Sequence, residues 1–325
     1  MGGTHARLAL FGDDEREPLA LEIYPSADHA SLPEIVEAFR AAHPERVVGA
    51  SVGVAGPVDE GRTEAVNLAW PVDAGELTRA LKLERAEVSV INDMEANAWG
   101  ITALADDDLV ALKDAPAEPG GTLALISAGT GLGEGFATRG ESGLRAHASE
   151  GGHVDFAPRS DLEAELRDWL ARDGKHVSYE RVCSGIGILN IYGFLRQRSA
   201  QAEPAWLAKE RGAQGAAAIT HAGLERRDRV ASEALDLMLS VYGAQAGNLA
   251  LTVMATGGVY LGGGIAPKVL PRLREGGFMR AFTDKGRLSE LLERIPVHVI
   301  LNELTALLGA ARHARARRSR TAPSA

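Results

Sequence analysis

Residues 122–133 read Thr-Leu-Ala-Leu-Ile-Ser-Ala-Gly-Thr-Gly-Leu-Gly. The apolar segment 122–126 predicts a buried strand, and the three glycines predict a tight turn into a return strand over 133–138. Glycine allows the backbone to approach a ligand closely, so consecutive N–H groups can surround a phosphate. The stretch lacks the Lys-Ser/Thr of a P-loop and the spacing of a dinucleotide fingerprint. It therefore predicts either a phosphate turn or an ordinary glycine hairpin.

Strands and helices alternate on both sides of this turn, which is typical of an α/β protein with partly parallel sheets. Further strands are expected at 7–11, 47–54, 87–91, 258–261 and 297–301, and helices at 33–42, 73–83, 93–103, 161–171, 184–198 and 228–254, with another starting at Pro267. The polar stretch 106–121 contains two prolines and is expected to be a loop crossing into a second domain. The arginine-rich tail from Ala310 is expected to be a solvated helix end that frays.

Each half of the chain has a glycine–threonine turn and a strand that ends in glycines. The first half has Gly2-Gly3-Thr4 and the segment 52–57, and the second has Gly129-Thr130-Gly131 and the segment 259–267. The order suggests a duplicated α/β unit with a cleft between the copies.

The amino-acid composition indicates which broad class of protein this chain belongs to. The chain has 325 residues, 45% hydrophobic and 24% charged, with a net charge of −9. These values are typical of a soluble globular protein and argue against nucleic acid or an anionic membrane as the main partner. The single cysteine, Cys183, can form neither an internal disulfide nor a cysteine-rich zinc site, so no metal site built by the protein is expected. No signal peptide or run of 18 apolar residues is present, which indicates a cytoplasmic protein.

Several polar residues could carry chemistry. Asn92-Asp93 follows a short strand and could supply a general base and a hydroxyl ligand, or be a turn and helix cap. The segment Glu150–Asp155 places two carboxylates and His153 around a flexible turn, which suits a hydroxyl-rich sugar or an ordinary surface loop. Glu180 read alone resembles a first-turn helix glutamate. Glu134 follows the glycine turn and would repel a phosphate there, so its side chain is expected to point away.

Taken in order, these motifs resemble those of bacterial glucokinases. The resemblance extends from Gly2 to about Gly309 and rests on Gly2–Thr4 with Arg7, Asn92-Asp93, Gly129–Gly133, Glu150–Pro158, Val177–Gly185 and Gly257–Pro267. It implies a two-domain actin-like (ribonuclease H-like) sugar kinase fold with an interdomain cleft. The implied domains are 1–103 plus 303–325 and 104–302. The implied reaction is ATP-dependent phosphorylation of the 6-hydroxyl of glucose, with Mg²⁺ as cofactor and a homodimer as the expected assembly.

The resemblance also implies roles for residues. Asp93 is implied as the catalytic base, and the sugar hydroxyls are assigned to Asn92, Glu150, His153, Glu180 and Asn67, with Trp70 nearby. The phosphates of ATP are assigned to Gly2, Gly3, Thr4, Gly129, Thr130, Gly131 and Gly133, and the adenosine part to Gly258, Gly262, Gly263 and Gly264. A kinase for mannose or fructose is an alternative, and so is a sugar-binding regulator with impaired catalysis.

The start of the chain departs from the family's pattern. In the family, an apolar strand with an aspartate precedes Gly-Gly-Thr, with one residue between, and here Met1 occupies that intervening place. Loss of a buried strand would leave neighbouring backbone groups unpaired. A start assigned to an internal methionine is expected, with a real loss of the strand as the alternative.

Overall fold

The computed structural model describes residues 4–13, 16–63, 70–141, 143–172 and 174–321. The chain divides into two compact units. The first unit comprises residues 1–105, 140–148 and 302–325, and the second comprises 106–139 and 149–301. The domain bounds predicted from the sequence differ from this division mainly in the segment 140–148.

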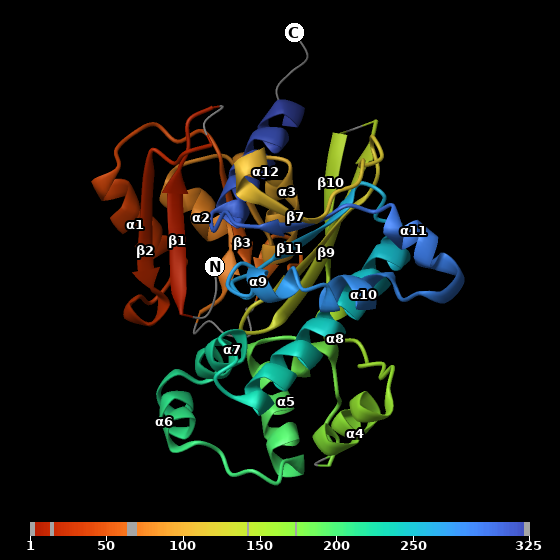
Figure 1. Ribbon diagram of the computed structural model, residues 1–325. Helices are drawn as coiled ribbons and strands as arrows, with labels where there is room; N and C mark the ends of the chain where they lie inside the picture. The colour runs from red at the N-terminus through yellow and green to blue at the C-terminus, as the bar shows by residue number, and fades with distance from the viewer. Residues whose placement is uncertain (1–3, 14–15, 64–69, 142, 173, 322–325) are drawn as a thin grey trace. The chain divides into compact units, whose positions relative to one another are not determined.

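Among the described residues, the first unit contains three two-stranded sheets and the helices α1, α2, α3 and α12, several of which are labelled in Figure 1. Its elements are β1 (His5–Leu10), β2 (Ala20–Pro25), η1 (Ser26–Asp28), α1 (Leu32–Ala42), β3 (Ala50–Val54), β4 (Arg62–Thr63), β5 (Val72–Asp73), α2 (Ala74–Leu81), η2 (Arg85–Glu87), β6 (Val88–Asn92), α3 (Asp93–Ile101) and α12 (Thr305–Thr321). Asp73 caps α2 as predicted, because its Oδ1 accepts the N–H of Glu76 at 3.0 Å.

The strands of the first unit pair only two by two among the described residues. β1 pairs with β2 antiparallel, and β3 pairs with β6 in parallel. Residues of β1 and β3 both line a cavity of about 510 Å³, together with side chains of α1 and α12. Asp93 and Asn97 of α3 also line this cavity. The cavity is partly open to solvent, and Asp93 at the start of α3 lies in its wall.

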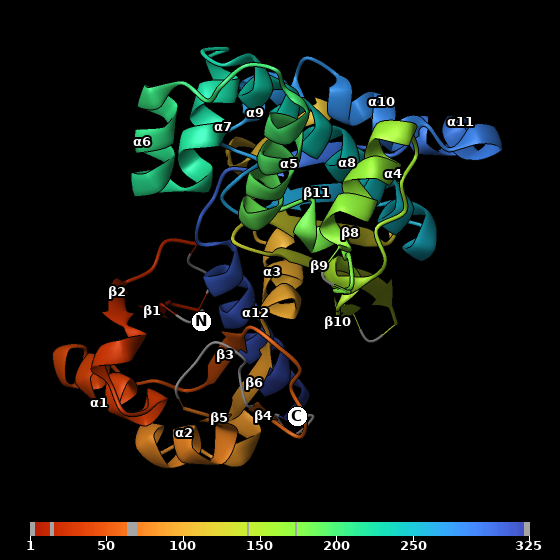
Figure 2. The ribbon, with the colours of Figure 1, turned by 90° about the horizontal axis from the view of Figure 1, so that it is seen from below.

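Helices α3 and α12 pack side by side, as Figure 2 shows. Their backbones approach so closely that a Cβ on Gly309 would lie 1.7 Å from the carbonyl oxygen of Ala96. Arginines anchor the helix further along, since Arg312 Nη1 donates to Thr102 O at 2.6 Å. The tail from Ala310 was expected to be a solvated helix end that frays. Helix α12 continues to Thr321, with residues 313–317 half-buried and residues 318–319 exposed.

The second unit combines one sheet with a largely helical middle. Its elements are η3 (Asp106–Asp108), β7 (Leu109–Lys113), β8 (Leu123–Ala128), β9 (Leu132–Gly140), η4 (Gly151–His153), α4 (Asp161–Leu170), η5 (Tyr179–Arg181), α5 (Gly185–Arg198), α6 (Ala205–Gln214), α7 (Ala216–Leu224), α8 (Arg229–Val253), β11 (Gly258–Gly262), α9 (Leu270–Leu273), α10 (Gly277–Thr283), η6 (Gly286–Leu288), α11 (Ser289–Glu293) and β12 (Val297–Ile300). β9 leads into β10 (Gly143–Ser149), whose residues 143–148 cluster with the first unit.

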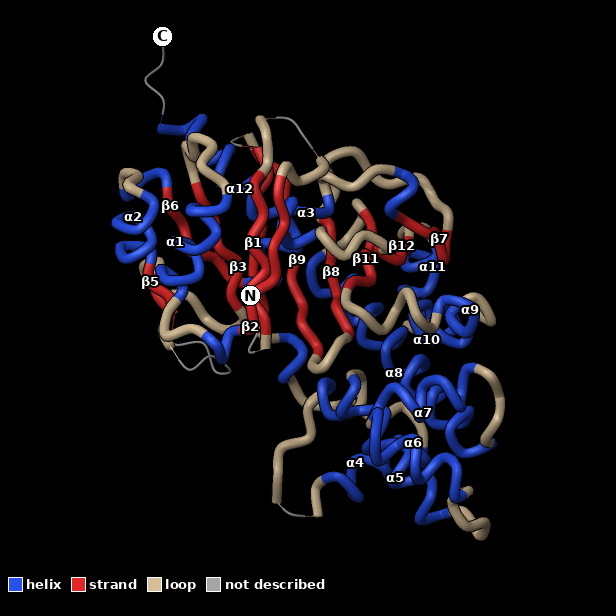
Figure 3. Tube along the Cα trace, turned by 90° about the vertical axis from the view of Figure 1, so that its left-hand side faces the viewer, coloured by secondary structure: helices blue, strands red, loops and turns tan. Residues whose placement is uncertain are grey.

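The strands of the second unit lie in the order β9-β8-β11-β12-β7 (Figure 3). β8, β11 and β12 are parallel, and β9 and β7 are antiparallel edges of this set. The segment 106–121 was expected to be a loop. That expectation is wrong for residues 106–113, which form η3 and a strand that pairs with β12, while residues 114–121 lie in no helix or strand. The helices α6 and α7 and the strand β10 had no counterpart in the sequence prediction.

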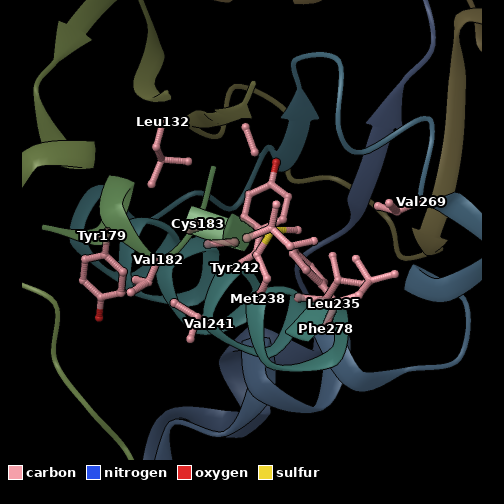
Figure 4. Close-up of a cluster of buried hydrophobic side chains, with 14 of the residues drawn as sticks. Leu132, Tyr179, Val182, Cys183, Leu235, Met238, Val241, Tyr242, Val269 and Phe278 are labelled. Atoms are coloured by element: carbon pink, nitrogen blue, oxygen red, sulfur yellow. The ribbon is translucent and has the colours of Figure 1, made fainter. Parts of the chain in front are cut away.

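The core of the second unit joins α8 to the sheet. Tyr242 and Cys183 lie in the buried cluster that Figure 4 shows. The hydroxyl of Tyr242 donates to the carbonyl oxygen of Ile126 at 3.1 Å, and its ring meets that of Phe278 edge to face. This contact ties α8 to β8, the strand that leads into the glycine turn. Among the described residues, every helix is too short or too polar to span a lipid bilayer.

Candidate functional site

Asn92 and Asp93 lie at the junction of β6 and α3 in the first unit. The side-chain oxygen of Asn92 accepts the N–H of Met94 at 2.8 Å, and its Nδ2 donates to Gly56 O at 3.0 Å. Asn92 is thus a helix cap, the alternative that the sequence left open. A sugar hydroxyl could be met only by the second hydrogen of its Nδ2.

Asp93 is the first residue of α3. Its Oδ1 accepts the N–H of Met94 at 2.9 Å. Burial raises the pKa of the Asp93 carboxyl above its ordinary value, and backbone hydrogen bonds oppose that rise. A carboxylate with a raised pKa is a stronger base than an exposed aspartate, which suits it for taking a proton from a hydroxyl near neutral pH.

The glycine turn between β8 and β9 belongs to the second unit. The N–H of Gly129 donates to Gly131 O at 2.8 Å, which closes the turn, and Thr130 is exposed at its tip. The N–H of Leu132 donates to Oε2 of Glu180 at 3.1 Å. The N–H groups of Thr130 and Gly131 are therefore the candidates for a phosphate oxygen.

The segment Glu150–His153 lies against the start of β9. A Cβ on Gly152 would lie 2.0 Å from Leu132 O, so only glycine permits this approach. The side chains of Glu150 and His153 are 59% and 58% exposed, and His153 Nε2 lies 3.9 Å from Glu150 Oε2. Both groups are accessible to a ligand.

Backbone pairing holds this segment beside the one that carries Glu180. The N–H of Tyr179 donates to Val154 O at 3.1 Å, and the N–H of Phe156 donates to Val177 O at 2.9 Å. The structure thus brings the glycine turn, the segment Glu150–His153 and Glu180 together within the second unit, although they are far apart in the sequence.

Glu134 on β9 is 2% exposed and lies inside the second unit. Its Oε1 accepts the Nε2 of Gln245 at 2.8 Å, and its Oε2 lies 2.1 Å from where a Cβ of Gly151 would be. Burial raises the pKa of Glu134 to about 7, against the lowering effect of the bond from Gln245.

The glycines at the end of β11 lie beside the glycine turn. Gly262 pairs with Ser127 in the sheet, and the N–H of Ile265 donates to Ala128 O at 3.2 Å. Gly258 is at the opposite end of β11, about 13 Å away by strand rise, and has a φ of +122°. The structure does not bring Gly258 together with Gly262–Gly264, and the backbone conformation accounts for a glycine there.

The remaining predicted site residues lie in the first unit, and none of those described has a free side chain in a binding position that the structure defines. Trp70 is 7% exposed in the core of the first unit and its Nε1 donates to His29 O at 3.0 Å, so it fills a structural position. Thr4 is exposed, and its carbonyl oxygen accepts the N–H of Ser26. Gly2, Gly3 and Asn67 lie outside the described residues.

Sequence reasoning missed the polar residues that support the site. Gln245, Asn248 and Lys285 are joined by hydrogen bonds beneath it. A glutamine on the buried face of a long apolar helix is the only local signal that could have drawn attention to them.

A family profile for glucokinase matches residues 1–317. The chain is 39% identical to a glucokinase of Synechocystis sp., covering 96% of this chain and 95% of that one. It is 40% identical to a glucokinase of Nostoc punctiforme, covering 96% of each. The crystal structure of a glucokinase from an Antarctic psychrotroph superposes with a TM-score of 0.82 at 30% identity, covering 97% of both chains.

A second solved structure shares the fold at lower identity. A ROK family glucokinase from Streptomyces griseus, solved with glucose and AMPPNP, gives a TM-score of 0.65 at 22% identity over 97% of both chains. These proteins have the two-domain actin-like sugar kinase fold. The chain belongs to the glucokinase family.

Proposed function

We propose that this protein transfers the γ-phosphoryl group of ATP to the 6-hydroxyl of glucose, giving glucose 6-phosphate and ADP. Membership of the glucokinase family supports the reaction. The observation that carries the assignment of the site is the contact between Glu180 and Leu132, which joins a sugar-binding candidate to the glycine turn.

In the proposed mechanism, Asp93 accepts the proton of the 6-hydroxyl as the O6–P bond forms and the bond to ADP breaks. Its raised pKa and its position at a helix start support this role. Phosphoryl transfer depends mostly on positioning and on stabilising the spread negative charge. A general base adds roughly 10²- to 10⁴-fold.

Sugar recognition is assigned to Glu150, His153 and Glu180 in the second unit. Carboxylates accept hydrogen bonds from hydroxyl groups in defined directions, and an imidazole can donate or accept. The exposure of Glu150 and His153 supports their availability. The amide of Asn92 already holds the start of α3, so only the second hydrogen of its Nδ2 is assigned to a sugar hydroxyl.

ATP is assigned to the glycine turn at 129–133 and to Gly262–Gly264. Their adjacency along β8 and β11 supports a shared nucleotide site in the second unit. We further propose Mg²⁺ as the companion of the phosphates. This ion usually binds through phosphate oxygens and water with one or two carboxylates. The described residues contain no cluster of three or more histidine, cysteine or carboxylate side chains. We name no residue of the chain as a ligand of the ion.

The decisive experiment is a coupled ADP-release assay with ATP, Mg²⁺ and a panel of glucose, mannose, fructose and N-acetylated hexoses. We expect the highest kcat/KM for glucose. A higher kcat/KM for another hexose would identify that hexose as the preferred substrate. Sugar binding without turnover on any of them would indicate a regulator instead.

We also propose a cytoplasmic location and a homodimer. The family and the composition support the first. Light scattering at micromolar concentration tests the second, and a mass of 34.3 kDa would identify a monomer.

A further inference from the structure

We propose that Gln245 and Asn248 of α8 are positioning residues for the sugar site. They would hold in fixed relation the two segments that bind the sugar in the proposed function, Glu150–His153 and Tyr179–Arg181. The inference rests on that proposed function, because it concerns the same site.

A continuous chain of hydrogen bonds runs through the second unit. Lys285 Nζ donates to Asn248 Oδ1 at 2.7 Å and to Ala244 O at 3.0 Å. Asn248 Nδ2 donates to Gln245 Oε1 at 3.1 Å. Gln245 Nε2 then donates to Glu134 Oε1 at 2.8 Å. Four side chains from α8, β9 and the segment after α10 are thus linked in one direction.

The two end groups determine this direction. An ammonium group is only a donor, so Lys285 requires that the oxygen of the Asn248 amide face it. The amide nitrogen of Asn248 must then face Gln245, whose own nitrogen is left to face Glu134. A carboxylate oxygen accepts that last bond. Each amide consequently has one favoured orientation, and hydrogen bonds of this kind make the surrounding structure more rigid.

The chain reaches both sugar-binding segments. At one end, Glu134 Oε2 lies against the backbone of Gly151, which follows Glu150. Partway along, Asn248 Nδ2 also donates to the hydroxyl of Tyr179 at 3.1 Å, and Tyr179 precedes Glu180. Displacing either amide would therefore move groups that hold sugar hydroxyls.

Burial keeps water away from the bond between Gln245 and Glu134, whereas Asn248 and Lys285 are half-buried. Glu134, Gln245 and Tyr179 are 2%, 5% and 3% exposed. A buried donor or acceptor that loses its partner is strongly unfavourable, so the surrounding segments would shift to satisfy it. The network is therefore sensitive to a change of a single donor into an acceptor.

The test first replaces the donor Gln245 with an acceptor, and then exchanges the amide and the carboxylate between positions 134 and 245. Q245E removes the donor that faces Glu134 and places two carboxyl groups together. The double variant E134Q/Q245E exchanges the two groups, so that an amide again donates to a carboxylate. The control Q197E makes the same chemical change on the exposed face of α5. A second variant, N248D, keeps the pairing with Lys285 but removes both N–H donors of Asn248.

We expect Q245E and N248D to raise the KM for glucose by about tenfold or more, because directly coupled residues show interaction energies of this order. The KM for ATP should change by no more than about threefold, and the double variant should return the glucose KM to within about threefold of the original. Q197E should leave both constants unchanged. The KM values are measured after circular dichroism and thermal unfolding confirm that each variant is folded.

Two results would overturn the inference. One is an unchanged glucose KM in a folded Q245E or N248D, and the other is a double variant that is no better than Q245E. A parallel measurement on E150Q separates this from failure of the proposed function. If E150Q raises the glucose KM while Q245E and N248D do not, only the positioning role fails. If E150Q also leaves the glucose KM unchanged, the sugar-site assignment itself is wrong.

Discussion

The carboxylate of Glu180 accepts the backbone N–H of Leu132 at 3.1 Å. This bond connects a residue assigned to the sugar with the turn assigned to the phosphates. A change at Glu180 should therefore affect both substrates, which a residue that contacts only the sugar would not do.

We expect E180A to raise the KM for glucose and the KM for ATP together, each by about tenfold or more, because the acceptor that holds the turn is lost. E180Q retains an acceptor oxygen and should raise mainly the glucose KM. Steady-state kinetics with each substrate varied in turn provide the measurement. An unchanged ATP KM in E180A would show that the bond does not hold the turn in solution.

Asp93→Asn should lower kcat by at least about a hundredfold while glucose binding stays largely intact. The amide keeps the size of the side chain but cannot take the proton. In the unmodified protein, kcat should also fall as pH decreases through the raised pKa of Asp93. Stopped-flow assays and calorimetric titration with glucose check the two parts. Near-normal turnover in the variant would show that Asp93 is not the catalytic base and has only a structural role at the start of α3.

Glu134 should make stability depend on pH. Its pKa is raised by burial from 4.5 to about 7 in the folded protein, so the folded state binds the proton more tightly than the unfolded state. The free energy of unfolding should therefore fall by about 3 kcal/mol as pH rises from below 4.5 to above 7.

Urea unfolding at pH 5 and pH 8 measures this effect. The bond from Gln245 lowers the pKa of Glu134 but offsets only part of the effect of burial. Burial raises the pKa of the Cys183 thiol, so this group adds no positive charge. E134Q should reduce the difference in the free energy of unfolding between pH 5 and pH 8. The control E233Q, which changes an exposed glutamate of α8, should keep the full difference. Equal differences in E134Q and the original protein would contradict the assignment.

Helix α12 offers a matched pair of stability variants. Gly309→Ala should lower the free energy of unfolding by about 3 kcal/mol or more, since the new Cβ would lie 1.7 Å from Ala96 O. Two residues along, Ala311 lines the cavity of the first unit. Ala311→Leu should raise the stability by about 1 kcal/mol by filling part of it. Chemical denaturation of both variants makes the comparison, and a destabilised Ala311→Leu would mean that the space is already filled in solution.

Local signals in the sequence predicted many elements of the fold. Asp73 and Asp228 begin α2 and α8 by accepting backbone N–H groups, as short polar residues before a helix indicate. The strand at 122–126 and its return after the glycine turn were predicted from hydrophobic pattern and turn chemistry, both of which depend on neighbours in the chain. The same motifs identified the glucokinase family.

Only the tertiary structure determined which polar residues meet. Glu134 and Gln245 are 111 positions apart, and nothing local to either indicates the other. The tail from Ala310 looked like a solvated helix end until its packing against α3 was known, and residues 109–113 became a strand by pairing with β12. The reason is physical. Turns and caps are stabilised by groups a few residues away, whereas a buried carboxyl, a docked helix or an edge strand depends on partners that only folding brings near.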